Sequence, residues 1–106
     1  MSGEQFFDIL KAMADESRYK IISILLKRDL CVGGLAKQLC ISKPAVSQHL
    51  QILRKTGLVT GEKRGYYTHY GVNRTLLIQF GEKSIEIAKA PENEKCSREQ
   101  TGKCDC

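Results

Sequence analysis

Five cysteines are the residues of this sequence best suited to chemistry. Three of them, Cys96, Cys104 and Cys106, fall within the final stretch CSREQTGKCDC, where polar and charged neighbours provide nothing to pack a thiol against. Thiolates are soft ligands that favour Cu(I), zinc-like ions and, by the same softness, arsenic(III). Three can close a trigonal site on arsenite, and a fourth would complete a tetrahedral site for zinc or cadmium. We predict that these three cysteines bind such an ion, with the C-x-C pair as the central chelate.

The other two cysteines occur earlier in the chain. Cys40 lies between the apolar residues Leu39 and Ile41, so we predict that it is a small buried hydrophobe. Cys31, in LCVGGL, suits either a metal ligand or a packed thiol, and the pattern leaves both open. An odd number of cysteines argues against a closed disulfide framework. The N-terminal MSGEQFFDIL lacks the basic region and cleavage site of a signal peptide, so we predict a cytoplasmic protein whose thiols stay reduced.

Positive charge concentrates in the first ninety residues, which carry 14 Lys and Arg against 8 Asp and Glu. Residues 91–106 carry 3 against 4, begin at Pro91 and hold few apolar side chains. We therefore predict one folded domain over 1–90 and a polar, cysteine-rich tail over 91–106. A basic domain favours an anionic partner, with nucleic acid as the first candidate. No apolar stretch reaches the roughly 18 residues that a membrane span needs, so no membrane partner is expected.

The apolar spacing predicts the elements that position these residues. Helical periodicity predicts helices over 4–14, 14–27, 32–39 and 74–90, with Asp15 as an N-cap, and a further helix within 41–59 that begins after the N-cap Ser42 and ends at Gly57. Two strand-like pieces, 58–63 and 66–72, flank Lys63-Arg64-Gly65 and predict a hairpin with a basic tip. The fold class is thus mainly α with a β-hairpin wing. Apolar residues on more than one face of the first and last helices indicate burial against a partner chain.

A tight helix–turn–helix followed by a basic-tipped hairpin is the winged-helix arrangement. The second helix of the pair then enters the major groove, and the wing touches the flanking backbone. We predict that Ser47 and Gln48 approach base edges, while the basic residues of the second helix and the hairpin contact phosphates. The full set predicted to contact double-stranded operator DNA is Lys43, Ala45, Ser47, Gln48, His49, Arg54, Lys63, Arg64 and Tyr66.

Four stretches of the sequence resemble the ArsR/SmtB family of metal-responsive repressors. They are AMADESRYKII, DLCVGGLAKQL, SKPAVSQHLQILRKTGLV and KRGYYTHYGV, and the resemblance runs over residues 4–90. It implies a homodimer paired through the first and last helices. It also implies binding to operator DNA, which two-fold symmetry predicts to be an inverted repeat, and release of that DNA when a metal binds.

The resemblance also narrows the choice of effector ion. The family's zinc-type site uses Asp and His pairs on the last helix, but the histidines of this chain are His49 and His69, and 74–90 holds none. The family's cysteine site at the start of the third helix keeps Cys31 and has Gly33 in the second cysteine position. Other members use a cysteine-bearing C-terminal tail, the role that Cys96, Cys104 and Cys106 would fill by region. Arsenite is therefore the first candidate effector, ahead of antimonite, cadmium and zinc, with no organic cofactor.

Two alternatives remain open. The first keeps the fold and DNA binding but makes the cysteines a redox or persulfide switch that forms disulfide-type links. The second is a winged-helix interaction module that binds no DNA and scavenges metal with its tail. An enzyme is not expected, because the sequence offers no acid–base pair, glycine-rich phosphate loop or nucleophile–base constellation.

Overall fold

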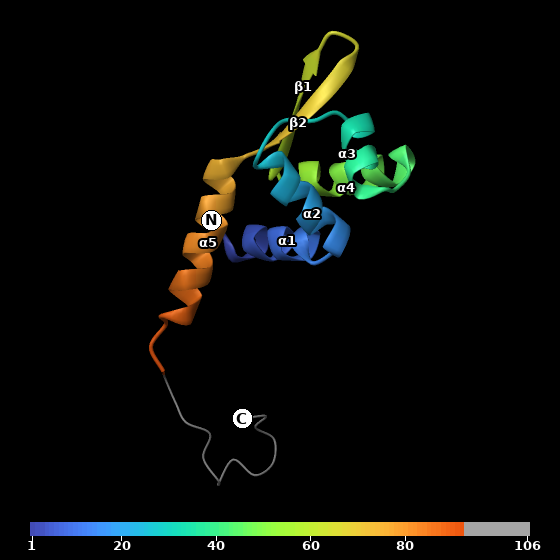
Figure 1. The fold of residues 1–106 in the computed structure, drawn as a ribbon. Coiled ribbons are helices and arrows are strands. Elements are labelled where there is room, and N and C mark those ends of the chain that lie inside the picture. The colour runs from blue at the N-terminus through green and yellow to red at the C-terminus, as the bar shows by residue number, and fades with distance from the viewer. Residues whose placement is uncertain (93–106) are drawn as a thin grey trace.

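The computed structural model describes residues 1–92, so Cys96, Cys104 and Cys106 lie outside the described residues. Within this range, four helices, a hairpin and a final helix follow one another, which confirms the predicted fold class (Figure 1). None of the helices in residues 1–92 is both long and apolar enough to cross a bilayer. The elements are α1 (Gly3–Met13), α2 (Glu16–Leu25), α3 (Val32–Leu39), α4 (Lys43–Lys55), β1 (Val59–Arg64), β2 (Tyr67–Val72) and α5 (Arg74–Ala88).

Polar caps explain where most of these helices begin. Except for α3, each helix in the described chain starts after a residue whose side chain accepts a hydrogen bond from the backbone N–H three residues later. The predicted caps Asp15 and Ser42 are confirmed. At Asp15, the hydrogen bond from the Arg18 N–H holds the pKa of the carboxyl below its usual value. The four caps are Ser2, Asp15, Ser42 and Asn73.

The core lies where α1, α2, α3 and α4 meet. Helix α4 contributes an apolar stripe to this core, since Val46, Leu50 and Leu53 are at most 2% exposed. They pack in one cluster with apolar residues of the other helices and with the start of β1. No polar or charged side chain is buried in the described part of the chain. The core therefore derives its stability from apolar burial, and the polar residues of α4 face outward.

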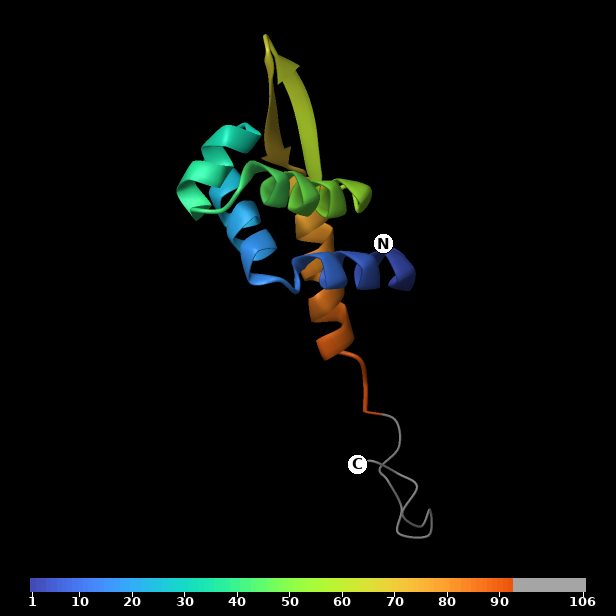
Figure 2. The same cartoon turned by 90° about the vertical axis from the view of Figure 1, so that its right-hand side faces the viewer.

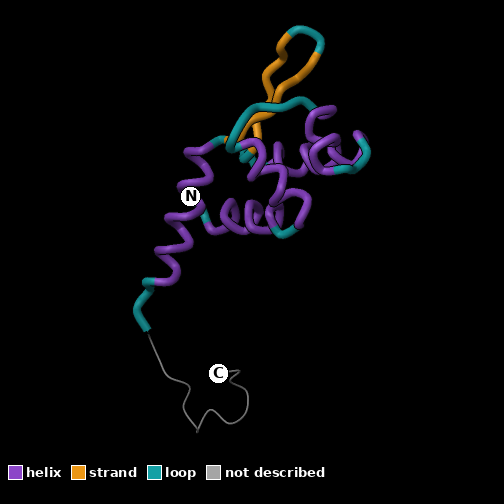
Figure 3. Tube along the Cα trace, in the orientation of Figure 1, coloured by secondary structure: helices purple, strands orange, loops and turns teal. Residues whose placement is uncertain are grey.

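The hairpin and α5 project from opposite ends of this helical body (Figures 1 and 2). The hairpin is the wing, and the colouring by secondary structure shows it as the strand-bearing part of the described chain (Figure 3). The predicted tip is displaced by one residue, because Lys63 pairs with Thr68 and Arg64 with Tyr67 inside the two strands. The turn is therefore Gly65-Tyr66. Gly65 has a φ of 66°, which the first position of a tight two-residue hairpin turn requires.

Helices α1 and α5 cross each other and share an aromatic contact (Figures 1 and 2). The rings of Phe6 and Phe80 stack with centroids 4.7 Å apart. Leu76 is the buried residue of α5, with 8% of its surface exposed. Five large apolar side chains on the same two helices are between 48 and 61% exposed, so residues 1–92 leave them largely uncovered. They are Phe7 and Leu10 of α1 and Ile78, Ile85 and Ile87 of α5.

Candidate nucleic-acid interface

The outward side of α4 presents a polar face. Ser47, Gln48, Gln51 and Arg54 are exposed, while the apolar stripe of the same helix is buried. These four side chains, together with Leu50 and Tyr70 of β2, line a hollow of about 270 Å³. The face therefore offers hydroxyl, amide and guanidinium groups beside the base of the wing. Hydroxyl, amide and guanidinium groups are the ones that read base edges and phosphates.

The turn between α3 and α4 sets the angle of this face. Cys40 ends α3 in the left-handed conformation, with a φ of 55°. The prediction that Cys40 is buried is wrong, because its side chain is exposed. Leu39 and Ile41 on either side pack against the core instead. The left-handed residue between them is left at the surface, with its Sγ 3.9 Å from the Lys37 carbonyl.

His49 lies apart from the polar face of α4. It is half-buried, and its Nδ1 is 3.3 Å from Nη1 of Arg18 on α2. Arg18 in turn donates from Nε to the Ala12 carbonyl at 2.6 Å. Through Arg18, His49 thus connects α4, the second helix of the helix–turn–helix and below called the recognition helix, to α2 and α1. Lys43 is exposed and Ala45 half-buried in the first turn of α4, so these two predicted residues flank the start of the polar face.

The wing carries exposed basic and aromatic side chains. Tyr66 in the turn is 97% exposed, and Lys63 is exposed with no ion pair within residues 1–92. Arg64 pairs with Asp29 at 2.9 Å and with Glu62 at 3.5 Å. Hydrogen bonds to these two carboxylates raise the pKa of Arg64, with Asp29 as the larger cause. The wing is therefore held to the loop between α2 and α3.

Backbone pairing strengthens this attachment. Tyr70 of β2 donates its N–H to the Leu30 carbonyl at 2.8 Å, and Leu30 donates to the Tyr70 carbonyl at 3.4 Å. Asp29 also lies close to the backbone of Gly71 in β2. A Cβ at this position would lie 2.9 Å from Oδ1 of Asp29, which is too close, so the glycine makes room for the Asp29 carboxylate. Sequence reasoning missed Asp29 and Tyr70. Asp29 pairs with Arg64 and Tyr70 with Leu30, 35 and 40 positions away, and no local pattern shows such contacts.

Cys31 occupies the N-cap position of α3 and is half-buried. It lies in a hollow of about 300 Å³ that is lined by the start of α3, Lys43 and the wing. A Cβ at Gly33 would lie 3.9 Å from the Cys31 Sγ, so a cysteine there could have supplied a neighbouring thiolate. The glycine removes that option. Within residues 1–92 no group of three metal-ligating side chains occurs, and a three-thiolate site that includes Cys31 requires cysteines from 93–106.

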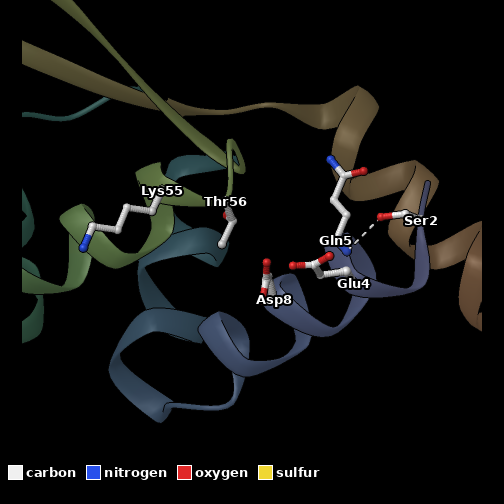
Figure 4. A pocket seen from close by; sticks show the side chains of 6 residues that line it. All are labelled: Ser2, Glu4, Gln5, Asp8, Lys55 and Thr56. Carbon is white, nitrogen blue, oxygen red and sulfur yellow. Dashed lines mark hydrogen bonds between the residues drawn. The ribbon is translucent and has the colours of Figure 1, made fainter.

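A third hollow shares no lining residue with the two described above. It has a volume of about 360 Å³ and lies between the first turns of α1 and the end of α4 (Figure 4). Its Ser2 hydroxyl caps α1 by accepting a hydrogen bond from the Gln5 N–H at 3.1 Å. Among residues 1–92, none of those predicted to bind DNA or metal lines it. The polar face of α4 and the wing therefore remain the candidate interface with DNA.

Comparisons with known proteins agree with this geometry. Residues 15–60 match the family described as "Bacterial regulatory protein, arsR family". The chain is 34% identical over 70 residues to the transcriptional repressor SdpR of Bacillus subtilis, covering 66% of this chain and 78% of SdpR. It is 29% identical over 104 residues to an arsenical resistance operon repressor of Staphylococcus xylosus, covering 98% of this chain and 100% of that protein. An ArsR-like transcriptional regulator from Rhodococcus sp. RHA1 superposes with a TM-score of 0.75 at 27% identity, covering 80% of each chain.

Proposed function

This chain belongs to the arsR family of bacterial regulatory proteins, and on that premise we propose a specific mode of action. The protein represses transcription by binding operator DNA as a homodimer, and it releases the DNA when cysteine thiolates bind a soft metal or metalloid ion, with arsenite as the first candidate. The family and the fold are those of transcriptional regulators, so the protein is not an enzyme. The observation that carries the proposal is the exposed polar face of α4 beside the wing.

DNA binding follows from the dimensions and chemistry of this face. An α-helix fits the major groove of B-DNA, and the 13 residues of α4 present their polar groups on one side. In the proposed complex, Ser47 and Gln48 approach base edges. The cations on α4 and the wing contact phosphates. These contacts fix the position of the protein along the duplex and supply most of the binding affinity. These cations are Lys43, Arg54, Lys63 and Arg64.

The exposed apolar face of α1 and α5 supports the homodimer. Isolated apolar side chains are common on protein surfaces, but five large exposed ones on two helices that contact each other favour burial by a partner. A second copy of the chain presents the same side chains and can cover them in a two-fold arrangement. The two recognition helices would then meet successive major grooves on one side of the duplex. The proposed operator is therefore an inverted repeat with half-sites about one helical turn apart.

The proposed effector site combines the tail thiolates with Cys31. Cys104 and Cys106 form the C-x-C chelate, Cys96 can supply a third thiolate, and Cys31 would connect the ion to the DNA-binding domain. The residues present fit a soft ion, because thiolates are the ligands that such ions prefer. The likeness to an arsenical resistance operon repressor along nearly the whole chain supports arsenite. Binding of the ion would itself supply the free energy that orders the tail.

The test is arsenite-driven release of DNA from fully reduced full-length protein. The DNA is a labelled duplex recovered by the wild-type protein from a random-sequence library, named the selected duplex below. We expect arsenite to release wild-type protein from the selected duplex. The double variant Cys104→Ser/Cys106→Ser should bind the duplex with unchanged affinity and should not respond. Release of this variant at the wild-type arsenite concentration would show that the tail is not the sensor.

Two single variants refine the site. Cys40→Ser is the matched control, because Cys40 is exposed and outside the proposed site, so the response should persist. Loss of release in Cys31→Ser, with arsenite still bound by the tail, would identify Cys31 as the ligand that couples the ion to DNA binding. Reduced protein that ignores arsenite but leaves DNA after treatment with a persulfide or peroxide would instead support the redox switch.

A further inference from the structure

Tyr70 is the residue shared by the two hollows of the DNA-binding side. It lines the hollow formed by the polar face of α4 and also the hollow that contains Cys31. The first hollow holds Gln48 and Arg54, and the second holds Lys43. A half-buried tyrosine of β2 therefore lies between the recognition helix and the start of α3.

Both edges of the β2 backbone fix the position of Tyr70. On one edge it exchanges two backbone hydrogen bonds with Leu30, the residue before Cys31. On the other edge it pairs with Gly61 of β1. A Cβ at Gly61 would lie 3.1 Å from Cε1 of Tyr70, so the absence of a side chain there leaves room for the ring. The ring is thus placed by the sheet, independently of any contact with DNA.

The ring in turn places Arg54. The guanidinium carbon of Arg54 lies 5.7 Å from the centroid of the Tyr70 ring, within the range of a cation–π contact. Arg54 is exposed and has a long side chain with many rotamers. A side chain of this kind loses rotamer entropy when it is fixed in a complex, and a contact that already orients it in the free protein reduces that loss. An arginine stacked on a ring keeps its donors free at the edge of the guanidinium plane.

We propose that Tyr70 is a positioning residue for operator binding, which holds the Arg54 guanidinium over the polar face of α4. The inference rests on the proposed function, because it assigns to Tyr70 a part in the DNA contact of Arg54. Tyr70 itself need not touch DNA. Its effect on affinity passes through Arg54, and this dependence distinguishes positioning from a general role in the stability of the wing.

A double-mutant cycle tests this dependence on the selected duplex. Tyr70→Leu removes the π face but keeps an apolar side chain at the position. It should weaken binding about two- to five-fold for each half-site in the wild-type background. In an Arg54→Ala background it should have no further effect, because the group that Tyr70 positions is gone. Tyr70→Phe keeps the π face and should bind within about two-fold of wild type.

Lys43 provides the matched control, since it is a second cation of the DNA-binding side with no cation–π contact to Tyr70 in residues 1–92. Tyr70→Leu and Lys43→Ala should weaken binding additively. Additive effects of Tyr70→Leu and Arg54→Ala, or a Tyr70→Phe variant as weak as Tyr70→Leu, would overturn the inference while leaving the proposed function intact. Wild-type protein that binds no duplex in a salt-dependent way would overturn both.

Discussion

Replacing Arg64 by alanine should flatten the salt dependence of DNA binding, although its guanidinium is already paired with carboxylates in the free protein. The partners are Asp29 at 2.9 Å and Glu62 at 3.5 Å, and the three side chains are between 43 and 72% exposed. Exposed ion pairs contribute little to stability, because water and salt screen them. We therefore expect Arg64 to exchange these carboxylates for a phosphate when the wing meets DNA.

The expected change in the salt dependence is proportional to the number of wings that contact DNA. On B-DNA, each neutralised phosphate contributes about −0.9 to the slope of log K against log salt concentration. Arg64→Ala should reduce the magnitude of the slope by about 0.9 for each bound wing, or about 1.8 for a dimer. Lys63→Ala is the matched control, because Lys63 precedes Arg64 in β1 and forms no ion pair within residues 1–92. It should flatten the slope equally. Both variants should weaken binding to selected and random duplexes alike, since phosphate contacts carry no sequence information.

Asp29→Asn separates the ion pair from the DNA contact. It removes the charge that competes for Arg64 and keeps the size of the side chain beside Gly71. Affinity for both duplexes should rise by at most about five-fold for each wing, and the gain should vanish in Asp29→Asn/Arg64→Ala. Fluorescence anisotropy titrations over a salt series measure all of these quantities. An unchanged slope in Arg64→Ala, beside a flattened slope in Lys63→Ala, would refute the exchange and leave Arg64 as a structural partner of Asp29.

Three further outcomes are expected. A chain truncated before Pro91 should remain folded, dimeric and DNA-binding by circular dichroism, ultracentrifugation and anisotropy, but insensitive to arsenite; a monomeric or unfolded product would make the tail structural. Ile85→Glu places a charge in the exposed apolar face of α5 and should shift the dimer toward monomer in sedimentation, whereas an unchanged dimer would locate the interface elsewhere. Ser42→Ala removes the hydrogen bond from the Ala45 N–H and should cost about 1 kcal/mol. That loss lowers the melting temperature by about 4–8 °C at fixed concentration, and Ser42→Asn should restore it.

Helix positions could be predicted from the sequence because their signals are local. Asp15 and Ser42 are good N-caps in any context, and the spacing of Val46, Leu50 and Leu53 identifies the buried side of α4 without reference to the rest of the fold. The polar face of α4 follows from the same periodicity. The part of the candidate interface that lies on a single helix was therefore predictable.

Features that depend on tertiary contact could not be predicted in this way. The apolar neighbours of Cys40 suggest burial, but the left-handed turn at the end of α3 directs those neighbours to the core and leaves Cys40 exposed. The turn of the wing lies one residue later than predicted, because the pairing of β1 with β2 continues to Arg64 and Tyr67. The pairing of Leu30 with Tyr70 joins segments forty residues apart. A single sequence carries no local signal for such a contact.

The place of Cys31 in the fold favours a site that includes it over one made of the tail alone. Cys31 follows Leu30, which is hydrogen-bonded to the wing, and is the N-cap residue of α3, the first helix of the helix–turn–helix. An ion held jointly by Cys31 and tail thiolates would therefore be attached next to Lys43 and the wing, in the hollow that these elements share. A ligand alters DNA affinity only if it binds one state of the protein better than another. A 100-fold release needs about 2.7 kcal/mol of such coupling, which is modest beside the binding energy of a structural metal site. A chelate confined to 93–106 would make no bond to any element that contacts DNA in the proposed complex. We therefore propose that Cys31 converts ion binding by the tail into release of the operator.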